Sequence, residues 1–580
     1  MRTWLPVLLL LAPAGWLAAQ PPARPVTPPG KDAPIVISPR RPAETDPPGF
    51  IVIRPGGRVP SVAQAPALVT PAVAQKDDGP KAAPAPVGGG FDYWFAAAVE
   101  GERIGFLQWT AKDVEMNGRK LRHGTKHQQF TVDRFGQVVT QFAEESTVET
   151  PEGEVLVTTA RQGLGKDQML VITGVADGRT LKVKGEGAAA GATESIPWPA
   201  GVVGVAGEMK IFANKKLAPG ATFDYLTFFA QGNRVLKVTV TYEGTEEAVL
   251  WQGTPARRLS RFTSRMEPLG ALKLPAATTW ADPDSGEPFR VEFDFPGLGG
   301  RVTFLRTTEG AAKAPIMRPL QLFNAQAIRL DRAIPGVHEK TTVAYKVTAT
   351  RDDEPATLFP ADGRQEVKNL DAKAKTFELH VSAARGPAKD AAAQLKEKTP
   401  GPEFLGSSFF INWDNDLVKG HAARAVAGLP ATAGAWDKAR AVEKWVNQNM
   451  KSAEFSQSMA TADNVAKNLS GDCTEYAMLA AAMCRAQGVP SRTVLGLVYT
   501  DDPSGRPFLA YHMWLEVYAE GQWLPLDPMF AAALRFAGVG PGHVKIADHS
   551  WHEERSFAPL FPVLRVLTAK PTFEVLRVAP

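Results

Sequence analysis

The alternation of hydrophobic and polar positions predicts that the first half of this chain is built from β-strands. Between residues 91 and 330, short runs place an apolar side chain at every second position, as at Val238, Val240 and Tyr242. Turn-forming pairs such as Glu243-Gly244 separate the runs, and this pattern is typical of strands that bury one face. The segment is expected to form one large antiparallel β domain, or two smaller ones.

A smaller β unit is predicted at residues 335–386, where the same alternation returns. Beyond it the period changes to that of helices, which we expect at about 416–427, 436–450 and 474–487. Residues 403–580 therefore combine helices with strands. The predicted fold class is a multidomain chain in which antiparallel β domains precede an α+β domain.

Three strands are predicted after the last helix, at about residues 492–499, 508–518 and 522–527. A tight turn at 519–521 makes the last two strands a hairpin. The loop between the first two is rich in Asp, Pro and Gly, and its Asp501-Asp502 pair is read as part of a hairpin loop rather than as a calcium site.

The turn at 519–521 sets a register that brings Asp527 towards His512. Side chains alternate along a strand, so His512, Trp514 and Glu516 share one face. If the turn is tight, Asp527 lies opposite Trp514 and diagonal to His512 on that face. Diagonal neighbours are about 7 Å apart, within reach of a carboxylate and an imidazole. A one-residue bulge in the hairpin would break this register.

Cys473 stands where the helix at 474–487 is expected to begin. Unpaired N–H groups and the dipole at a helix N-terminus favour an anion, and a neighbouring histidine lowers the pKa of a thiol further. The ordinary alternative is a buried core cysteine, which fits the polar Gly-Asp-Cys-Thr-Glu surroundings poorly. Cys484, set among alanines and a methionine, is read as that kind of core residue.

Together, Cys473, His512 and Asp527 offer the thiol, imidazole and carboxylate of a cysteine acyl-transfer site. The thiolate attacks a carbonyl carbon, the imidazole moves protons, and the carboxylate orients the imidazole. Each residue also has an ordinary interpretation: a core cysteine, a surface or core histidine, and a carboxylate that ends a strand. Finding all three in fitting contexts favours the catalytic interpretation.

The run from about residue 439 to 530 resembles the core of the transglutaminase-like superfamily. The motifs that carry the resemblance are Thr461-Ala462-Asp463-Asn464-Val465, Gly471-Asp472-Cys473-Thr474-Glu475-Tyr476-Ala477, Arg485-Ala486-Gln487-Gly488-Val489-Pro490-Ser491-Arg492, His512-Met513-Trp514-Leu515-Glu516-Val517 and Trp523-Leu524-Pro525-Leu526-Asp527-Pro528. The resemblance implies a papain-like α+β fold with the nucleophile on a helix and its two partners on adjacent strands.

By this resemblance, Cys473 is the nucleophile, His512 the general base and acid, and Asp527 the orienting carboxylate. The backbone N–H of Cys473 is expected to be one oxyanion donor, and the second donor is unassigned. Four further residues of the motifs are expected to support the site: Asp472, Glu475, Trp514 and Glu516.

The N-terminal ninety residues are interpreted as an export signal followed by a tether. Arg2 precedes an apolar run from Leu5 to Ala19, which is too short to span a bilayer comfortably. Residues 1–19 are therefore predicted to be a signal peptide cleaved near Ala19, and the proline-rich residues 20–90 a disordered linker. These features predict a secreted or periplasmic protein without stable membrane insertion.

Composition narrows the classes of partner and cofactor. The net charge of +4 over 580 residues comes without a dense Lys/Arg block, so nucleic-acid binding is not indicated. Two cysteines exclude a disulfide framework. His549 and His552 have the spacing of a metal pair, but no carboxylate or cysteine pattern completes it. We expect no metal or cofactor, and a protein or peptide as the substrate.

Three functional hypotheses follow from the sequence. The first is an enzyme that acts on carboxamide or peptide bonds, either by transfer to an amine or by hydrolysis, with hydrolysis slightly favoured. The second is a scaffold or binding protein of the cell envelope that has kept the fold without turnover. The third is a structural β-rich envelope protein in which the thiol domain is incidental. The sequence determines neither the acyl acceptor nor the oligomeric state.

Overall fold

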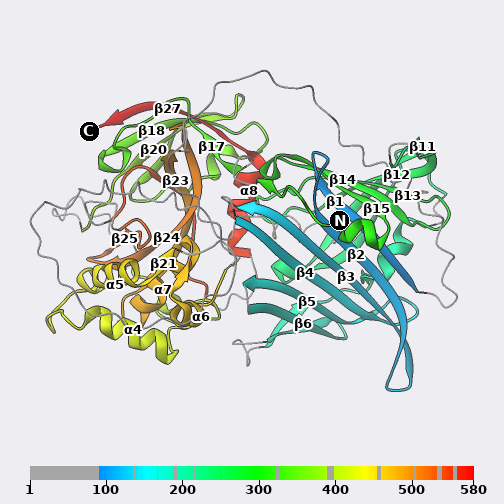
Figure 1. Ribbon diagram of the computed structural model, residues 1–580, viewed down its shortest axis with the longest axis horizontal. Helices are drawn as coiled ribbons and strands as arrows, with labels where there is room; N and C mark the ends of the chain where they lie inside the picture. The colour runs from blue at the N-terminus through cyan, green and yellow to red at the C-terminus, as the bar shows by residue number, and fades with distance from the viewer. Residues whose placement is uncertain are drawn as a thin grey trace, which may run out of the picture. The chain divides into compact units, whose positions relative to one another are not determined.

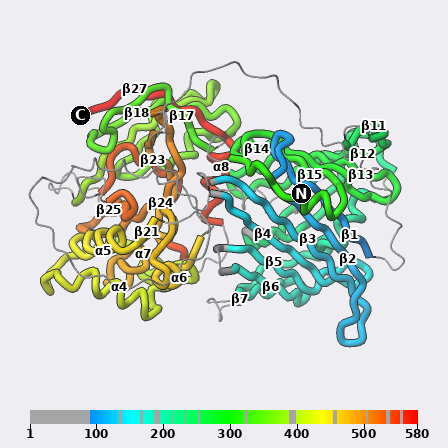
Figure 2. The backbone as a smooth tube through the Cα atoms, viewed as in Figure 1, coloured from blue at the N-terminus to red at the C-terminus, as the bar shows by residue number. Residues whose placement is uncertain are grey.

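The computed structural model describes residues 90–580 except 135–136, 166–167, 187–192, 214–215, 252–253, 322–325, 388–397, 453–458, 502–504, 532–537 and 553–557 (Figures 1 and 2). The predicted signal peptide at 1–19 and all but the last residue of the predicted linker at 20–90 lie outside the described residues, as does Asp502. Within the part of the chain that is described, no helix has both the length and the apolar character needed to span a bilayer.

One sheet of sixteen strands takes up the N-terminal half of the described chain. Its strands, in chain order, are β1 (Phe91–Val99), β2 (Glu102–Met116), β3 (Arg119–Arg134), β4 (Gln137–Glu149), β5 (Val155–Gly165), β6 (Gln168–Asp177), β7 (Thr180–Glu186), β8 (Thr193–Pro197), β9 (Val202–Val203), β10 (Thr222–Phe229), β11 (Arg234–Ala248), β12 (Arg257–Met266), β13 (Ala277–Ala281), β14 (Pro288–Phe295), β15 (Gly300–Thr307) and β16 (Leu320–Gln321). A short helix, α2 (Glu309–Lys313), follows β15.

The order β8-β7-β6-β5-β4-β3-β2-β1-β15-β14-β13-β12-β11-β10-β9 makes this sheet two meanders joined where β1 pairs with β15. Val238 and Val240 are buried in β11, as the alternation predicts. The N-terminal region is therefore β-rich, and its strands form one continuous sheet rather than two separate ones.

The small β unit is a four-stranded sheet with the order β19-β20-β18-β27. Its strands are β18 (Thr342–Thr348), β19 (Gln365–Asp371), β20 (Thr376–Ser382) and β27 (Thr572–Ala579). In Figure 2, β27 at the C-terminus runs beside β18, and Val347 pairs with Phe573. The ring of Phe573 packs edge-on against Tyr345, with centroids 5.6 Å apart. The last strand of the chain thus completes a sheet that begins more than two hundred residues earlier.

The C-terminal α+β region places helices against a second sheet of five strands. Its helices are α4 (Asp416–Val426), α5 (Ala435–Asn449), α6 (Ala462–Asn468), α7 (Cys473–Ala486) and α8 (Phe561–Ala569). The sheet strands are β17 (Ile328–Arg329), β23 (Ser491–Asp501), β24 (Pro507–Ala519), β25 (Gln522–Leu526) and β26 (His543–His549), and a separate parallel pair joins β21 (Lys451–Ser452) to β22 (Ser470–Gly471). The three helices and three strands predicted around the site all form, within one or two residues of the expected ends.

Helix α7 is the central element of this region. Every residue from Cys473 to Arg485 is buried, because α4, α5 and α6 pack on it from one side and β23 and β24 from the other (Figure 1). A helix that is apolar all round is typical of such a position. This packing places α7 against β24, the strand that carries His512.

The hairpin formed by β24 and β25 has the register that the sequence predicts. Leu515 pairs with Leu526, and continuing this register by one residue places Trp514 opposite Asp527. Glu520 and Gly521 both have positive φ, of 53° and 80°, as a two-residue type I′ turn requires. No bulge interrupts the paired residues of this hairpin, so Asp527 comes to the face of β24 that carries His512.

Candidate active site

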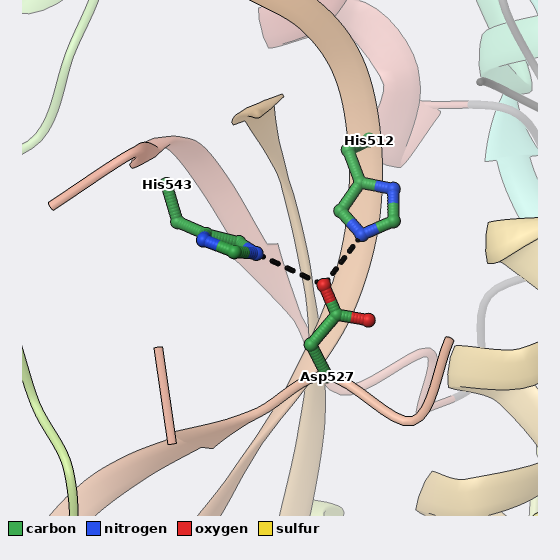
Figure 3. Close-up of side chains that lie close together, drawn as sticks. All are labelled: His512, Asp527 and His543. Atoms are coloured by element: carbon green, nitrogen blue, oxygen red, sulfur yellow. Dashed lines mark hydrogen bonds and ion pairs between the residues drawn. The ribbon is translucent and has the colours of Figure 1, made fainter. Parts of the chain in front are cut away.

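Asp527 binds two imidazoles through the same carboxylate oxygen. Nε2 of His512 lies 2.7 Å from Oδ2 of Asp527, and Nε2 of His543 lies 2.9 Å from it (Figure 3). The side chains of all three residues are fully buried. The structure therefore brings His512 and Asp527 together and adds His543, which was not among the expected site residues.

The rest of the Asp527 carboxylate and its backbone are held by other hydrogen bonds. Oδ1 accepts from the backbone N–H groups of Met529 at 3.1 Å and Phe530 at 3.2 Å. The backbone N–H of Asp527 donates to Oε1 of Glu443 on α5 at 3.0 Å. Because Oδ1 is used by the backbone, Oδ2 is left to receive both imidazoles.

Electrostatics keep Asp527 ionised in this buried position. Burial alone raises the pKa of its carboxyl, but the attraction of His512 and the hydrogen bonds from both imidazoles outweigh it and hold the pKa below the ordinary value. Burial lowers the pKa of His543 to about 3, against the opposing pull of Asp527. His543 is therefore neutral at physiological pH, and the carboxylate that it contacts is charged.

The positions of two ring hydrogens follow from the charge of Asp527. An ionised carboxylate only accepts hydrogen bonds, so Nε2 of His512 and Nε2 of His543 each carry a hydrogen. In His543, which is neutral, Nδ1 then carries a lone pair. Among the described residues, neither Nδ1 atom has a hydrogen-bond partner. Nδ1 of His512 is thus not engaged by another group of the described chain.

Cys473 is the first residue of α7, and a capping box fixes this end of the helix. Oδ1 of Asp472 accepts from the backbone N–H of Thr474 at 2.9 Å and from its hydroxyl at 2.7 Å. Oε2 of Glu475 accepts from the backbone N–H of Asp472 at 3.0 Å. The thiol therefore lies at the positive end of a well-capped helix that packs on the strand carrying His512. Cys473 is fully buried.

The expected supporting residues divide into three groups. Asp472 and Glu475 shape the start of α7, and Glu475 also accepts from the backbone of Ala460 at 3.1 Å. Burial, and next the charge of Asp472, raise the pKa of Glu475 well above its ordinary value. Trp514 is fully buried, with its ring stacked at 6.2 Å from His512 and edge-on at 5.3 Å from His543. It therefore contacts both imidazoles.

Glu516 serves a different cluster. Its carboxylate accepts from Nε of Arg492 at 2.7 Å and from Nζ of Lys545 at 3.0 Å. Burial alone raises the pKa of Glu516, but these two cations lower it to about 2. Glu516 lies four residues beyond His512, or about 13 Å along the strand. Its contacts join β23, β24 and β26, so it stabilises the sheet under the site rather than the imidazoles.

His543 reaches the site through pairing of β26 with β23. His512 pairs with Gly496 on one side of β23, and His543 pairs with Val498 on the other. Gly496 and Val498 are two residues apart, so both histidines lie on the same face of the sheet. The missing side chain at Gly496 leaves room for Trp514, because a Cβ there would lie 2.4 Å from its ring.

Sequence reasoning also missed Glu443, which contacts the backbone of Asp527. Burial, and next the charge of Asp527, raise the pKa of Glu443 to about 8. It lies on an amphipathic helix whose pattern accounts for its apolar positions only. Nothing in the local sequence distinguishes Glu443 from the solvent-facing charges around it, so the signal exists only in three dimensions.

The three polar side chains of Figure 3 can also be tested as a metal site. One ligand atom from each of His512, Asp527 and His543 lies within 4.8 Å of the others. A histidine that binds a metal almost always donates its other ring N–H to an acceptor. Within the described part of the chain, neither Nδ1 has such a partner, so the surroundings fit a hydrogen-bonded group better than a metal centre.

One segment of the chain matches a known protein family. Residues 421–528 match the family model described as the transglutaminase-like superfamily, and this segment contains Cys473, His512 and Asp527. A comparison with curated proteins found no match.

Three solved structures are similar to parts of the chain. A candidate cysteine protease from Cytophaga hutchinsonii is 16% identical, covers 38% of this chain and 81% of its own, and has a TM-score of 0.24. The periplasmic domain of TgpA from Pseudomonas aeruginosa is 16% identical, with coverages of 36% and 88% and a TM-score of 0.22. A β-barrel-like protein of unknown function from Brucella abortus is 11% identical, with coverages of 37% and 95% and a TM-score of 0.27. These scores are too low for residue-by-residue comparison of sites.

Proposed function

We propose that this protein, whose residues 421–528 are a transglutaminase-like core, is an enzyme that transfers acyl groups from protein or peptide amides through a thioester on Cys473. The observation that carries the proposal is the 2.7 Å contact between His512 and Asp527, which orients one ring nitrogen and leaves the other as a base. The position of Cys473 at the capped start of α7 supports it.

The proposed reaction has two halves. Nδ1 of His512 takes the thiol proton of Cys473, and the thiolate attacks the amide carbonyl carbon. The tetrahedral intermediate collapses as the C–N bond breaks, and ammonia or an amine leaves with the proton from His512. An amine or water then attacks the thioester while His512 takes its proton, and the thiol leaves with that proton. Asp527 stays ionised throughout and stabilises the imidazolium.

The burial of the site affects whether an amine or water accepts the acyl group. Cys473 is fully buried and His512 is 2% exposed, so a substrate reaches the thiol only after the residues that cover it have moved. Exclusion of water from the thioester favours transfer to an amine, whereas an open site favours hydrolysis. Deamidation, proteolysis and crosslinking are thus outcomes of one mechanism, and the experiment decides between them.

The same burial favours a second function, that of a catalytically silent scaffold or binding protein of the cell envelope. In that case the triad would remain as a buried polar cluster that stabilises the core. We also propose that the protein is exported, on the ground of the predicted signal peptide at residues 1–19, and that it acts on protein or peptide partners outside the cytoplasm.

Mass spectrometry of a glutamine peptide incubated with the full chain, with and without a primary amine, tests the proposal. An amine adduct, a gain of about one dalton from deamidation, or a cleaved backbone would each identify the reaction. C473A should abolish the change, whereas C484A, which removes the other buried thiol, should not. An unchanged peptide with the native protein would favour the scaffold.

A further inference from the structure

We propose that His543 is a positioning residue of this site, which fixes the Asp527 carboxylate beneath His512 by donating its Nε2–H to the shared oxygen Oδ2. The inference rests on the proposed function, because it assigns a role within the same acyl-transfer site. It adds a second imidazole to the Cys-His-Asp set expected from the sequence.

The Asp527 carboxylate receives four hydrogen bonds. Oδ1 accepts two backbone N–H groups, and Oδ2 accepts His512 at 2.7 Å and His543 at 2.9 Å. Without His543, Oδ2 would have one donor only, and a buried carboxylate with a vacant acceptor is costly. The fourth bond removes the freedom of the carboxylate to turn away from His512.

The backbone that carries His543 is itself held in place. The Arg364 guanidinium donates to the carbonyl of His543 at 3.0 Å and to that of Gly540 at 3.2 Å. A Cβ at Gly540 would lie 2.3 Å from the carbonyl oxygen of His338, so the backbone at Gly540 passes close to the backbone at His338. The segment that carries His543 therefore has little room to move, and this keeps the imidazole in contact with Asp527.

A purely space-filling role at position 543 would not require an imidazole. Nδ1 of His543 has no hydrogen-bond partner within the described residues, although the ring is fully buried. An apolar ring would fill the space beside Trp514 without burying an unpaired nitrogen. What the imidazole supplies in return is the hydrogen bond from its Nε2 to Oδ2 of Asp527, which is the dashed line between these residues in Figure 3.

Donation by His543 should also change the pH at which His512 takes up a proton. Donation by His543 draws part of the negative charge of Oδ2 away from His512, so the imidazolium of His512 is stabilised less than it would be by an unshared carboxylate. Removing that donor should raise the pKa of His512. Among the described residues, the other ionisable groups that interact with this cluster are His338, whose pKa is lowered by burial, and Glu443, which accepts from the backbone N–H of Asp527.

The test compares H543L, which removes the donor, with H543Q, which can place an amide N–H near the position of Nε2. With the glutamine peptide as substrate, H543L should lower kcat on the order of tenfold with KM unchanged. The acidic limb of the pH–kcat profile, along which His512 loses a proton to become the base, should move to higher pH, and H543Q should restore most of both. H380L, which removes an imidazole of β20 that contacts Glu378 at 2.8 Å, is the matched control and should keep the native profile.

A second readout does not depend on turnover. In protein with carbon-13-labelled histidines, the NMR titration of His512 should have a midpoint higher by about one pH unit in H543L than in the native chain. If H543L does not fold, H543F replaces it. An unchanged His512 midpoint, or an H543Q defect as large as that of H543L, overturns the inference. Absence of turnover in the native protein would refute the proposed function alone, and the titration would still decide the role of His543.

Discussion

Oδ2 of Asp527 lies 2.7 Å from Nε2 of His512, and Nδ1 of the same ring has no hydrogen-bond partner among the described residues. In the proposed mechanism, Nε2 therefore holds the ring in place and Nδ1 transfers the proton. The base of an acyl-transfer site requires one ring nitrogen that is held and one that is free to exchange a proton. Because Asp527 holds Nε2, its carboxylate is the most informative group to alter.

Two substitutions of Asp527 should separate the effect of its charge on activity from the effect of its shape on stability. D527A leaves the N–H groups of His512 and His543 buried without an acceptor, so it should destabilise the fold by about 3 kcal/mol or more. D527N keeps the shape and loses the charge, so it should lower kcat on the order of a hundredfold while the thermal midpoint changes less. Steady-state kinetics and thermal unfolding measure both effects. Full activity of D527N would contradict the role assigned to the carboxylate.

The two cysteines should differ in reactivity although both are buried. Burial, and next the charge of Glu443, raise the pKa of the Cys484 thiol, so it should stay unmodified in the folded protein. Cys473 begins a helix, and its labelling by iodoacetamide should have a pH midpoint below the value of about 8.5 for a free thiol. Peptide mapping after labelling distinguishes the two sites, and H512A should raise the Cys473 midpoint. Equal labelling of both thiols would count against catalysis.

A methyl group at Gly496 should damage both the fold and the site. A Cβ there would lie 2.3 Å from the backbone oxygen of Val544 and 2.4 Å from the ring of Trp514. We expect G496A to cost about 1–3 kcal/mol and to lower kcat, because Trp514 stacks on His512. In the matched control G420A, on helix α4, nothing lies within 4 Å of the new Cβ, and stability should rise slightly. Thermal unfolding of both variants tests the contrast, which an unaffected G496A would refute.

The parts of the site that the sequence predicted are those fixed by local rules. The turn at Glu520-Gly521 determines the register of the hairpin, and that register alone brings Asp527 to His512. The polar residues around Cys473 determine the start of α7, because Asp472 and Glu475 can satisfy its N-terminal donors. In both cases the residues that decide the geometry lie within a few positions of the site.

The parts that the sequence did not predict depend on pairing between distant segments. His543 comes to Asp527 because β26 adds to the far side of β23, and Glu443 comes from a helix 84 residues before Asp527. Likewise β17 joins the sheet of the C-terminal region, and β27 joins that of the small β unit. Hydrophobic alternation indicates that a segment forms a strand, but it does not indicate which other strand that segment pairs with. The signal peptide, the linker and the roles of the triad residues stay predictions.

Glu443 should make the stability of the protein fall as the pH rises. Its pKa is about 8 in the folded protein, raised first by burial and then by Asp527, against about 4.3 for an unfolded chain. Between these values the folded state holds a proton that the unfolded state has lost. The stability contribution is therefore complete below about pH 4.3 and is lost progressively as the pH rises towards 8.

The variant E443Q removes this titration and keeps an oxygen that can accept from the backbone N–H of Asp527. We expect native protein and E443Q to have similar unfolding free energies near pH 4, and E443Q to be more stable by a few kcal/mol at pH 9. Urea unfolding at several pH values measures the difference, and D437N, at an exposed position in the first turn of the same helix, is the control. Parallel curves for E443Q and the native chain across this range would show that Glu443 is already ionised in the folded protein. The Asp527 carboxylate would then have a second buried charge beside its backbone, and the basicity of His512 would be set by both.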